Sequence, residues 1–206
     1  GRDVLSAGGS AADAAVATYF ALSVTMPSTA GLGGGGVCLA HGYDAGTTDT
    51  FDFLPRAAPE GRVAVPTNIR GMAALHARYG RLQWAQLLGA AEGLARFGTP
   101  LSRALAKELE TIGERVLADP EMARVSAPDG VLLREGQTLE QPQLAGTLSR
   151  IRQNGGGELY LGQFARQFAE AAQTMGAPLS LQSLQGAVPT ATPSTGIPFG
   201  NHMLFI

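Results

Sequence analysis

The sequence predicts an α+β fold in which helices outnumber strands, and three observations lead to this prediction. A helix of small residues near the start is followed by a run of glycines and then by two segments typical of a β-hairpin. Apolar residues recur at helical spacing through the middle of the chain. Strand-like sequence returns only in the last residues. The 206 residues are enough for one sizeable core, and we expect a single domain over 1–206.

The first predicted helix begins at a capping signal. Ser10 and Asp13 have the spacing of an N-cap and its acidic partner. The helix continues to about Val24 and carries no charge after Asp13, so we expect it to be buried. Pro27 is predicted to end it, and 28–36 is predicted to be a loop.

Two strands are predicted next. Residues 37–43 and 47–54 read as a hairpin closed by a turn at 44–46. Cys38 falls at an expected core position of the first strand, which predicts a buried, unreactive thiol. Residues 55–68 contain three prolines and two arginines, so we expect an extended loop there.

The middle of the chain is predicted to be helical, because its apolar residues recur every three or four positions. Glycine and proline mark where these helices end. The predicted helices are 69–79, a stripe from Trp84 to Leu94, a stripe from Leu101 to Val116 ended by Asp119-Pro120, a stripe from Leu144 to Ile151, and a stripe from Tyr160 to Met175. Helical spacing fades from 178 onward, and 203–206 is predicted to be a strand. The chain opens like the tail of a helix and stops within this strand, so we expect more polypeptide at both ends of the intact protein.

Composition excludes several classes of function. The formal net charge is −2 and basic residues are scattered, so neither nucleic acid nor an anionic membrane is a predicted partner. No apolar run approaches the ~18 residues of a membrane span. Cys38 is the only cysteine, and the three histidines lie outside zinc-binding motifs. We therefore predict no disulfide, metal or cofactor, and the compartment stays open.

The glycine run is the first candidate site. Gly31-Leu32-Gly33-Gly34-Gly35-Gly36 satisfies the pattern of a dinucleotide loop, but its order is helix, loop, strand rather than strand, loop, helix. The preferred interpretation is steric, because glycines let another backbone or a substrate approach closely. Gly33, Gly34, Gly35 and Gly36 are therefore candidate substrate-binding residues, with packing against the sheet as the alternative.

Arg56 is the second candidate. It follows the second predicted strand, where an arginine can bind a carboxylate through two parallel hydrogen bonds. The alternative is a surface arginine paired with Asp52 or Glu60. No nucleophile with an adjacent base and no G-x-S-x-G motif is present. We therefore predict no catalytic residue in this chain. If the protein is an enzyme, its reactive group must come from another polypeptide segment.

The motifs above resemble a known family. Val4-Leu5, Gly8–Ala17, Pro27, Gly31–Gly36 and Ala58-Pro59 are similar to the start of the large subunit of γ-glutamyltranspeptidases and their acylase relatives. The family usually has Asn at the position of Ser10 and Val at that of Ala12. Later segments follow the family order, so that the resemblance covers most of the chain; they include Pro66 to Gly80, Gly98, Asp119-Pro120, Gln141-Pro142 and Tyr160-Leu161-Gly162.

The resemblance implies a four-layer α-β-β-α sandwich of the N-terminal-nucleophile hydrolase type. It implies a precursor that cuts itself, after which the N-terminal Thr of the small subunit is the nucleophile and its α-amine the base. This chain would be the large subunit or a fragment of it, with the small subunit as its partner. The substrate would be a γ-glutamyl or related acyl amide, the acyl group would pass to water or an amine, and the location would be periplasmic or secreted.

One position departs from the family pattern. The family places a carboxylate-binding arginine two residues after an aspartate, which is Leu54 when counted from Asp52 and Pro55 when counted back from Pro59. Arg56 is the nearest cation. If the arginine is lost, an acylase with another acyl group, such as a glutaryl-type β-lactam acylase, becomes the alternative. The alternative of another class is an inactive homologue that acts as a binding or scaffold protein.

Overall fold

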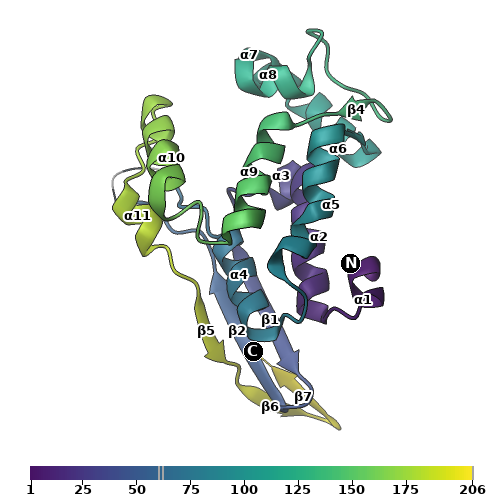
Figure 1. Ribbon diagram of the computed structural model, residues 1–206, viewed down its shortest axis with the longest axis vertical. Helices are drawn as coiled ribbons and strands as arrows, with labels where there is room; N and C mark the ends of the chain where they lie inside the picture. The colour runs from purple at the N-terminus through teal and green to yellow at the C-terminus, as the bar shows by residue number, and fades with distance from the viewer. Residues whose placement is uncertain (60, 62, 206) are drawn as a thin grey trace.

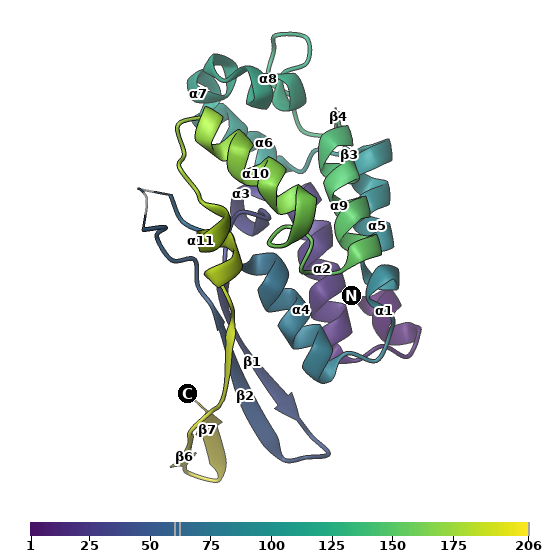
Figure 2. The same ribbon diagram turned by 60° about the vertical axis from the view of Figure 1, so that its left-hand side comes forward.

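The computed structural model describes residues 1–59, 61 and 63–205 (Figures 1 and 2). Helices are assigned at α1 (Arg2–Ser6), α2 (Ala11–Thr25), α3 (Pro27–Ala30), α4 (Asn68–Tyr79), α5 (Trp84–Phe97), α6 (Arg103–Thr111), α7 (Gly113–Ala118), α8 (Pro120–Ser126), α9 (Pro142–Asn154), α10 (Gly162–Thr174) and α11 (Leu181–Gly186). Strands are assigned at β1 (Gly36–Gly42), β2 (Thr47–Phe53), β3 (Thr99–Pro100), β4 (Thr138–Leu139), β5 (Thr190–Pro193), β6 (Gly196–Phe199) and β7 (His202–Phe205).

The main sheet is antiparallel and has the order β1-β2-β5. The predicted hairpin is confirmed: Gly36 pairs with Phe53 and Gly42 with Thr47. The sequence did not predict β5, which pairs along the other side of β2 with Thr190 opposite Asp52. Its four residues are all exposed and include no large apolar side chain, so only the pairing identifies it as a strand.

Helices cover one face of this sheet (Figure 2). Helix α4 packs on β1 and β2, α2 packs on α4 and α5, and α9 packs on α5. Phe51 and Phe53 point from β2 into the resulting core. Cys38 faces this side as expected, but its side chain is half-buried rather than fully buried. On the opposite face of β1, Val37 is 51% exposed and Leu39 is 49% exposed.

The predicted cap of α2 is confirmed. The Ser10 N–H donates to Asp13 Oδ2 at 2.8 Å, and the Asp13 N–H donates to Ser10 Oγ at 3.1 Å. The expectation that the whole helix is buried is wrong, because Leu22 is 41% exposed. Apolar residues surround the helix, and α4 and α5 cover one side of it, whereas Leu22 lies on a side that is left partly exposed.

The boundaries of three helices differ from the prediction, and in two of them a proline begins a helix that it was expected to end. The stripe from Leu101 to Val116 is not one helix, because it breaks at Ile112 into α6 and α7. Pro120 was predicted to end a helix and instead begins α8, with Asp119 Oδ1 accepting from two backbone N–H groups. Pro27 likewise begins α3. Proline cannot continue a helix, but it suits the first turn of the next one.

The last strands form a hairpin of their own. Strands β6 and β7 pair with Ile197 opposite Leu204. The strand predicted at 203–206 is confirmed as far as Phe205, and Ile206 lies outside the described residues. In the part of the chain that the structure describes, no helix has the length and apolar character needed to cross a bilayer.

Candidate functional site

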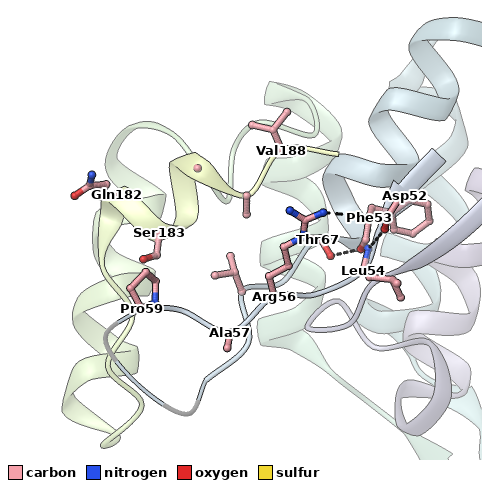
Figure 3. Close-up of a pocket in the computed structure, with 13 residues that line it drawn as sticks. Asp52, Phe53, Leu54, Arg56, Ala57, Pro59, Thr67, Gln182, Ser183 and Val188 are labelled. Atoms are coloured by element: carbon pink, nitrogen blue, oxygen red, sulfur yellow. Dashed lines mark hydrogen bonds and ion pairs between the residues drawn. The ribbon is translucent and has the colours of Figure 1, made fainter. Parts of the chain in front are cut away.

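A cavity of about 550 Å³ lies between two walls that are far apart in the sequence (Figure 3). The first wall runs from the end of β2 to the start of α4, and the second is α11 with the residues that follow it. The lining residues are Asp52, Phe53, Leu54, Arg56, Ala57, Pro59, Val65 and Thr67 from the first wall, and Gln182, Ser183, Gly186, Ala187 and Val188 from the second.

The first wall is shaped by side-chain bonds at the end of β2. Asp52 Oδ1 accepts the Leu54 N–H at 2.9 Å, which turns the chain out of the strand. Thr67 Oγ1 donates to the carbonyl of Phe53 and joins the start of α4 to the same turn. Leu54 is left 51% exposed on the pocket side. The wall is therefore apolar at Leu54 and polar at Asp52 and Thr67.

Arg56 lies in this wall, and its backbone is fixed because its carbonyl accepts the Val65 N–H at 2.9 Å. Its Nη2 is 3.9 Å from Asp52 Oδ2, and the two side chains are 80% and 37% exposed. An ion pair this long and this exposed contributes little to stability. The guanidinium therefore keeps donors that can bind a carboxylate in the pocket. Glu60, the other partner considered from the sequence, lies outside the described residues.

The second wall was not predicted, because α11 has only six residues and no apolar stripe. Its start is capped by Ser180, whose Oγ accepts the Ser183 N–H at 3.0 Å. Leu184 is fully buried and holds the helix against the main core. Ser183 and Val188 line the side of the wall that faces Arg56 (Figure 3).

The glycine run lies behind the first wall. Gly34 O accepts the N–H groups of Thr67 and Asn68 at 2.9 and 3.0 Å, and Asn68 Nδ2 donates to Gly31 O at 3.0 Å. A Cβ at Gly35 would overlap Phe53 O and Thr67 Oγ1. Close approach of backbone, rather than an unusual φ, is therefore the reason for glycine at this position.

None of Gly33, Gly34, Gly35 and Gly36 is among the residues that line the cavity. Gly33 is exposed, and a Cβ there would meet no described atom within 4 Å. The run thus supports the wall through Gly34 and Gly35 and leaves Gly33 open at the surface. The sequence reasoning missed Thr67. A threonine just before a helical stripe is typical of an N-cap, but the Thr67 side chain makes no cap hydrogen bond and donates to Phe53 O instead.

Asp13 forms the most buried polar centre outside the cavity. Its side chain is 0% exposed, and Oδ2 accepts the N–H groups of Arg81 and Leu82 at 2.9 and 3.2 Å as well as that of Ser10. Burial alone would raise the pKa of this carboxyl, but the N–H donors outweigh it and hold the pKa below its usual value. His76 Nε2 lies 3.6 Å from Oδ1. This centre ties the start of α2 to the 80–82 loop, which is a structural role.

The remaining candidates form no metal site. Among the described residues, no three His, Cys, Asp or Glu side chains gather as metal ligands. His41 Nδ1 contacts Thr48 Oγ1 at 2.8 Å, and burial raises the pKa of the Cys38 thiol.

A second cavity of about 640 Å³ lies between the start of α2 and β1, and it contains neither Arg56 nor the glycine run. The cavity beside Arg56 is therefore the candidate site.

Comparison with known proteins shows which family this chain is similar to. The family model described as gamma-glutamyltranspeptidase matches residues 1–61 and 58–204. The glutathione hydrolase proenzyme of Bacillus subtilis is 32% identical over 90% of this chain and 35% of its own length. The chain thus spans about a third of the length of such relatives.

Solved structures agree in fold. The gamma-glutamyltranspeptidase of Helicobacter pylori superposes with a TM-score of 0.92 at 26% identity, over 99% of this chain and 65% of that one. A cephalosporin acylase of Bacillus halodurans has a TM-score of 0.88 at 27% identity, over 98% and 42%. The predicted α+β fold of the N-terminal-nucleophile hydrolase type is confirmed. From its match to the family model over nearly its whole length, this chain belongs to the gamma-glutamyltranspeptidase family.

Proposed function

We propose that this chain is the large-subunit portion of a γ-glutamyltranspeptidase-like amidohydrolase, forming one domain over 1–206, and that the cavity beside Arg56 holds the acyl group of the donor. The observation that carries the proposal is an arginine with available donors in a cavity of about 550 Å³. Membership of the family supports the reaction class. The partner is the small subunit of the same precursor, which packs its own sheet against the open face of β1 at Val37 and Leu39.

In this proposal the small subunit carries out the reaction and this chain binds the donor. The N-terminal Thr of the small subunit attacks the amide carbonyl while its α-amine takes the hydroxyl proton. The C–N bond breaks, the amine leaves with a proton, and the acyl group remains as an ester on the Thr. Water or an acceptor amine then takes the acyl group. Hydrogen-bond donors of the small subunit stabilise the oxyanion.

This chain binds and orients the donor. Arg56 donates two parallel hydrogen bonds to a carboxylate at the far end of the acyl group. Asp52, 3.9 Å away, keeps the guanidinium near the wall when no donor is bound. The run from Gly33 to Gly36 supports the wall from behind through Gly35 and lines the approach at Gly33. Catalysis needs no residue of this chain as nucleophile or base.

A second candidate is an acylase that accepts a different acyl group. Leu54 lines the cavity, and it is the position where the family resemblance expects the carboxylate-binding arginine when counted from Asp52. An apolar side chain there favours an acyl stem without an α-amino acid head. The structural likeness to a cephalosporin acylase supports the same candidate. Arg56 would then bind the terminal carboxylate of a glutaryl-type group.

The two candidates are separated by substrate. The assembled two-subunit protein is incubated with γ-glutamyl and glutaryl anilides, and release of the aromatic amine is recorded. Turnover of the first alone supports the transpeptidase, and turnover of the second alone supports the acylase. Complete processing with turnover of neither would overturn both in favour of an inactive binding or scaffold protein.

A further inference from the structure

Arg70, which the proposed function does not use, connects the two walls of the cavity. It lies in the first turn of α4, and its Nη1 is 3.3, 2.9 and 2.7 Å from the carbonyl oxygens of Leu184, Gln185 and Ala187. These carbonyls belong to the end of α11 and the residue after it. All three contacts thus join α4 to the second wall.

The surroundings of Arg70 hold its guanidinium in place. The guanidinium carbon lies 4.2 Å from the centre of the Tyr160 ring, and Tyr160 is fully buried. Within the described residues, no carboxylate forms an ion pair with Arg70. Burial lowers the pKa of the group, but arginine remains charged in proteins. A charged donor facing several carbonyls forms stronger hydrogen bonds than a neutral one.

Because of where Arg70 lies in the chain, its hydrogen bonds connect the two walls of the cavity. Thr67, three residues earlier, lines the first wall, whereas Ala187 and Val188 line the second. One side chain therefore spans from the end of one wall to the end of the other. Burial of Leu184 and the pairing of β5 with β2 also hold the second wall. Loss of Arg70 should consequently loosen that wall without unfolding the core.

We propose that Arg70 is a positioning residue that fixes the spacing between the two walls and thereby sets the affinity of the cavity for the acyl group. The effect on donor affinity rests on the proposed function, whereas the effect on the mobility of the second wall does not. Affinity and wall mobility can be measured separately in the same variants.

The experiment uses the assembled two-subunit protein with Arg70→Ala and Arg70→Lys. The matched control is Arg150→Ala, because Arg150 also stacks on an aromatic ring, with its guanidinium 4.9 Å from the centre of Phe164, but does not contact the cavity walls. Hydrogen exchange of the backbone amides at 184–188 reports on the wall. Steady-state kinetics with the donor anilide that is turned over reports on binding.

Arg70→Ala is expected to speed exchange at 184–188 about tenfold and to raise the donor KM about tenfold while kcat changes less than about twofold. Arg70→Lys should recover part of both effects, because an ammonium still donates to carbonyls but does not reproduce the planar guanidinium. Arg150→Ala should change neither. If Arg70→Ala does not assemble, Arg70→Lys alone tests the inference. Its exchange rate at 184–188 and its donor KM should then both be higher than those of the parent protein.

Unchanged exchange at 184–188 in both Arg70 variants would overturn the inference, whatever the activity. Faster exchange with an unchanged KM would instead show that the wall is held as described but does not bind the donor. That result would contradict the link to affinity and the placement of the donor in this cavity. Equal changes in Arg150→Ala would also overturn the inference, because the effect would then not be specific to the wall.

Discussion

Arg56 and Asp52 lie four residues apart around the turn that leaves β2, with Nη2 and Oδ2 separated by 3.9 Å (Figure 3). The contact is too long for a good charge-assisted hydrogen bond. The other carboxylate oxygen of Asp52, Oδ1, already accepts a hydrogen bond from the Leu54 N–H. The pair therefore holds Arg56 loosely at the cavity, where an incoming carboxylate can replace Asp52 as its partner.

Arg56→Ala is expected to raise the KM of the donor at least about tenfold, because a charge-assisted, bidentate contact is lost. Arg56→Lys should recover only part of this, since lysine binds a carboxylate as a point charge. The measurement is steady-state kinetics of the assembled protein. Arg103→Ala is the control, because Arg103 is also exposed and paired with a carboxylate, Glu135, but is not among the residues that line the cavity. Unchanged KM and kcat in Arg56→Ala would remove Arg56 from the site.

Leu54→Arg is expected to shift donor preference toward γ-glutamyl groups. The new guanidinium would lie in the cavity wall, at the position that the family pattern gives to the carboxylate-binding arginine when counted from Asp52. The ratio of kcat/KM for γ-glutamyl over glutaryl anilides should rise at least about threefold. Leu54→Met, which is neutral and similar in volume, should leave the ratio unchanged. An equal ratio in both variants would show that residue 54 does not contact the acyl group.

Gly35→Ala is expected to destabilise the protein by about 1–3 kcal/mol, the usual cost of overpacking. The added methyl group would overlap Phe53 O and Thr67 Oγ1 and lie 2.6 Å from Pro55 Cδ. Gly33→Ala is the matched control and should stay within about 0.5 kcal/mol of the parent, because nothing described lies within 4 Å of the new atom. Thermal unfolding of both variants is the measurement. Equal melting temperatures would contradict the close approach at Gly35.

Local features were predictable from the sequence. The Ser10–Asp13 cap and the β1–β2 hairpin depend on residues that are close along the chain, and both are confirmed. Arg56 could be singled out because an arginine after a strand end is a local signal as well. The same reasoning identified the family, since most of its front motif lies between Val4 and Gly36.

Long-range features were not predictable. The second wall of the cavity is held by Arg70, whose partners lie 114 to 117 residues away. Strand β5 places Thr190 and Thr192 on one face and Ala191 and Pro193 on the other, but it has only four residues and no large apolar side chain, so its sequence gives a weak strand signal. The need for glycine at position 35 is also a long-range effect, because it comes from Phe53, Pro55 and Thr67 and not from the neighbouring glycines.

Asp13 predicts how stability depends on pH. Its folded-state pKa is held below the ordinary value because the N–H donors at Ser10, Arg81 and Leu82 outweigh the effect of burial. A depressed carboxyl pKa stabilises the fold at pH values above the unfolded-state pKa of about 3.9, and this stabilisation is lost as the pH falls through the folded-state pKa. The contribution of Asp13 should therefore be constant from pH 7 to about pH 5 and decline below about pH 4.

Asp13→Asn removes the charge but keeps an oxygen that can accept. It is expected to lower stability at pH 7 by about 1–3 kcal/mol, because hydrogen bonds to a charged acceptor are replaced by weaker ones in a buried site. The gap between parent and variant should narrow as the pH falls from 5 to 3, since the parent then loses its own charge. Asp119→Asn serves as the control: Asp119 also accepts backbone N–H groups, but it is exposed, so its effect should be smaller at every pH. Melting temperatures measured from pH 3 to pH 7 test this, and a gap for Asp13→Asn that stays constant over that range would show that the Asp13 charge does not stabilise the fold.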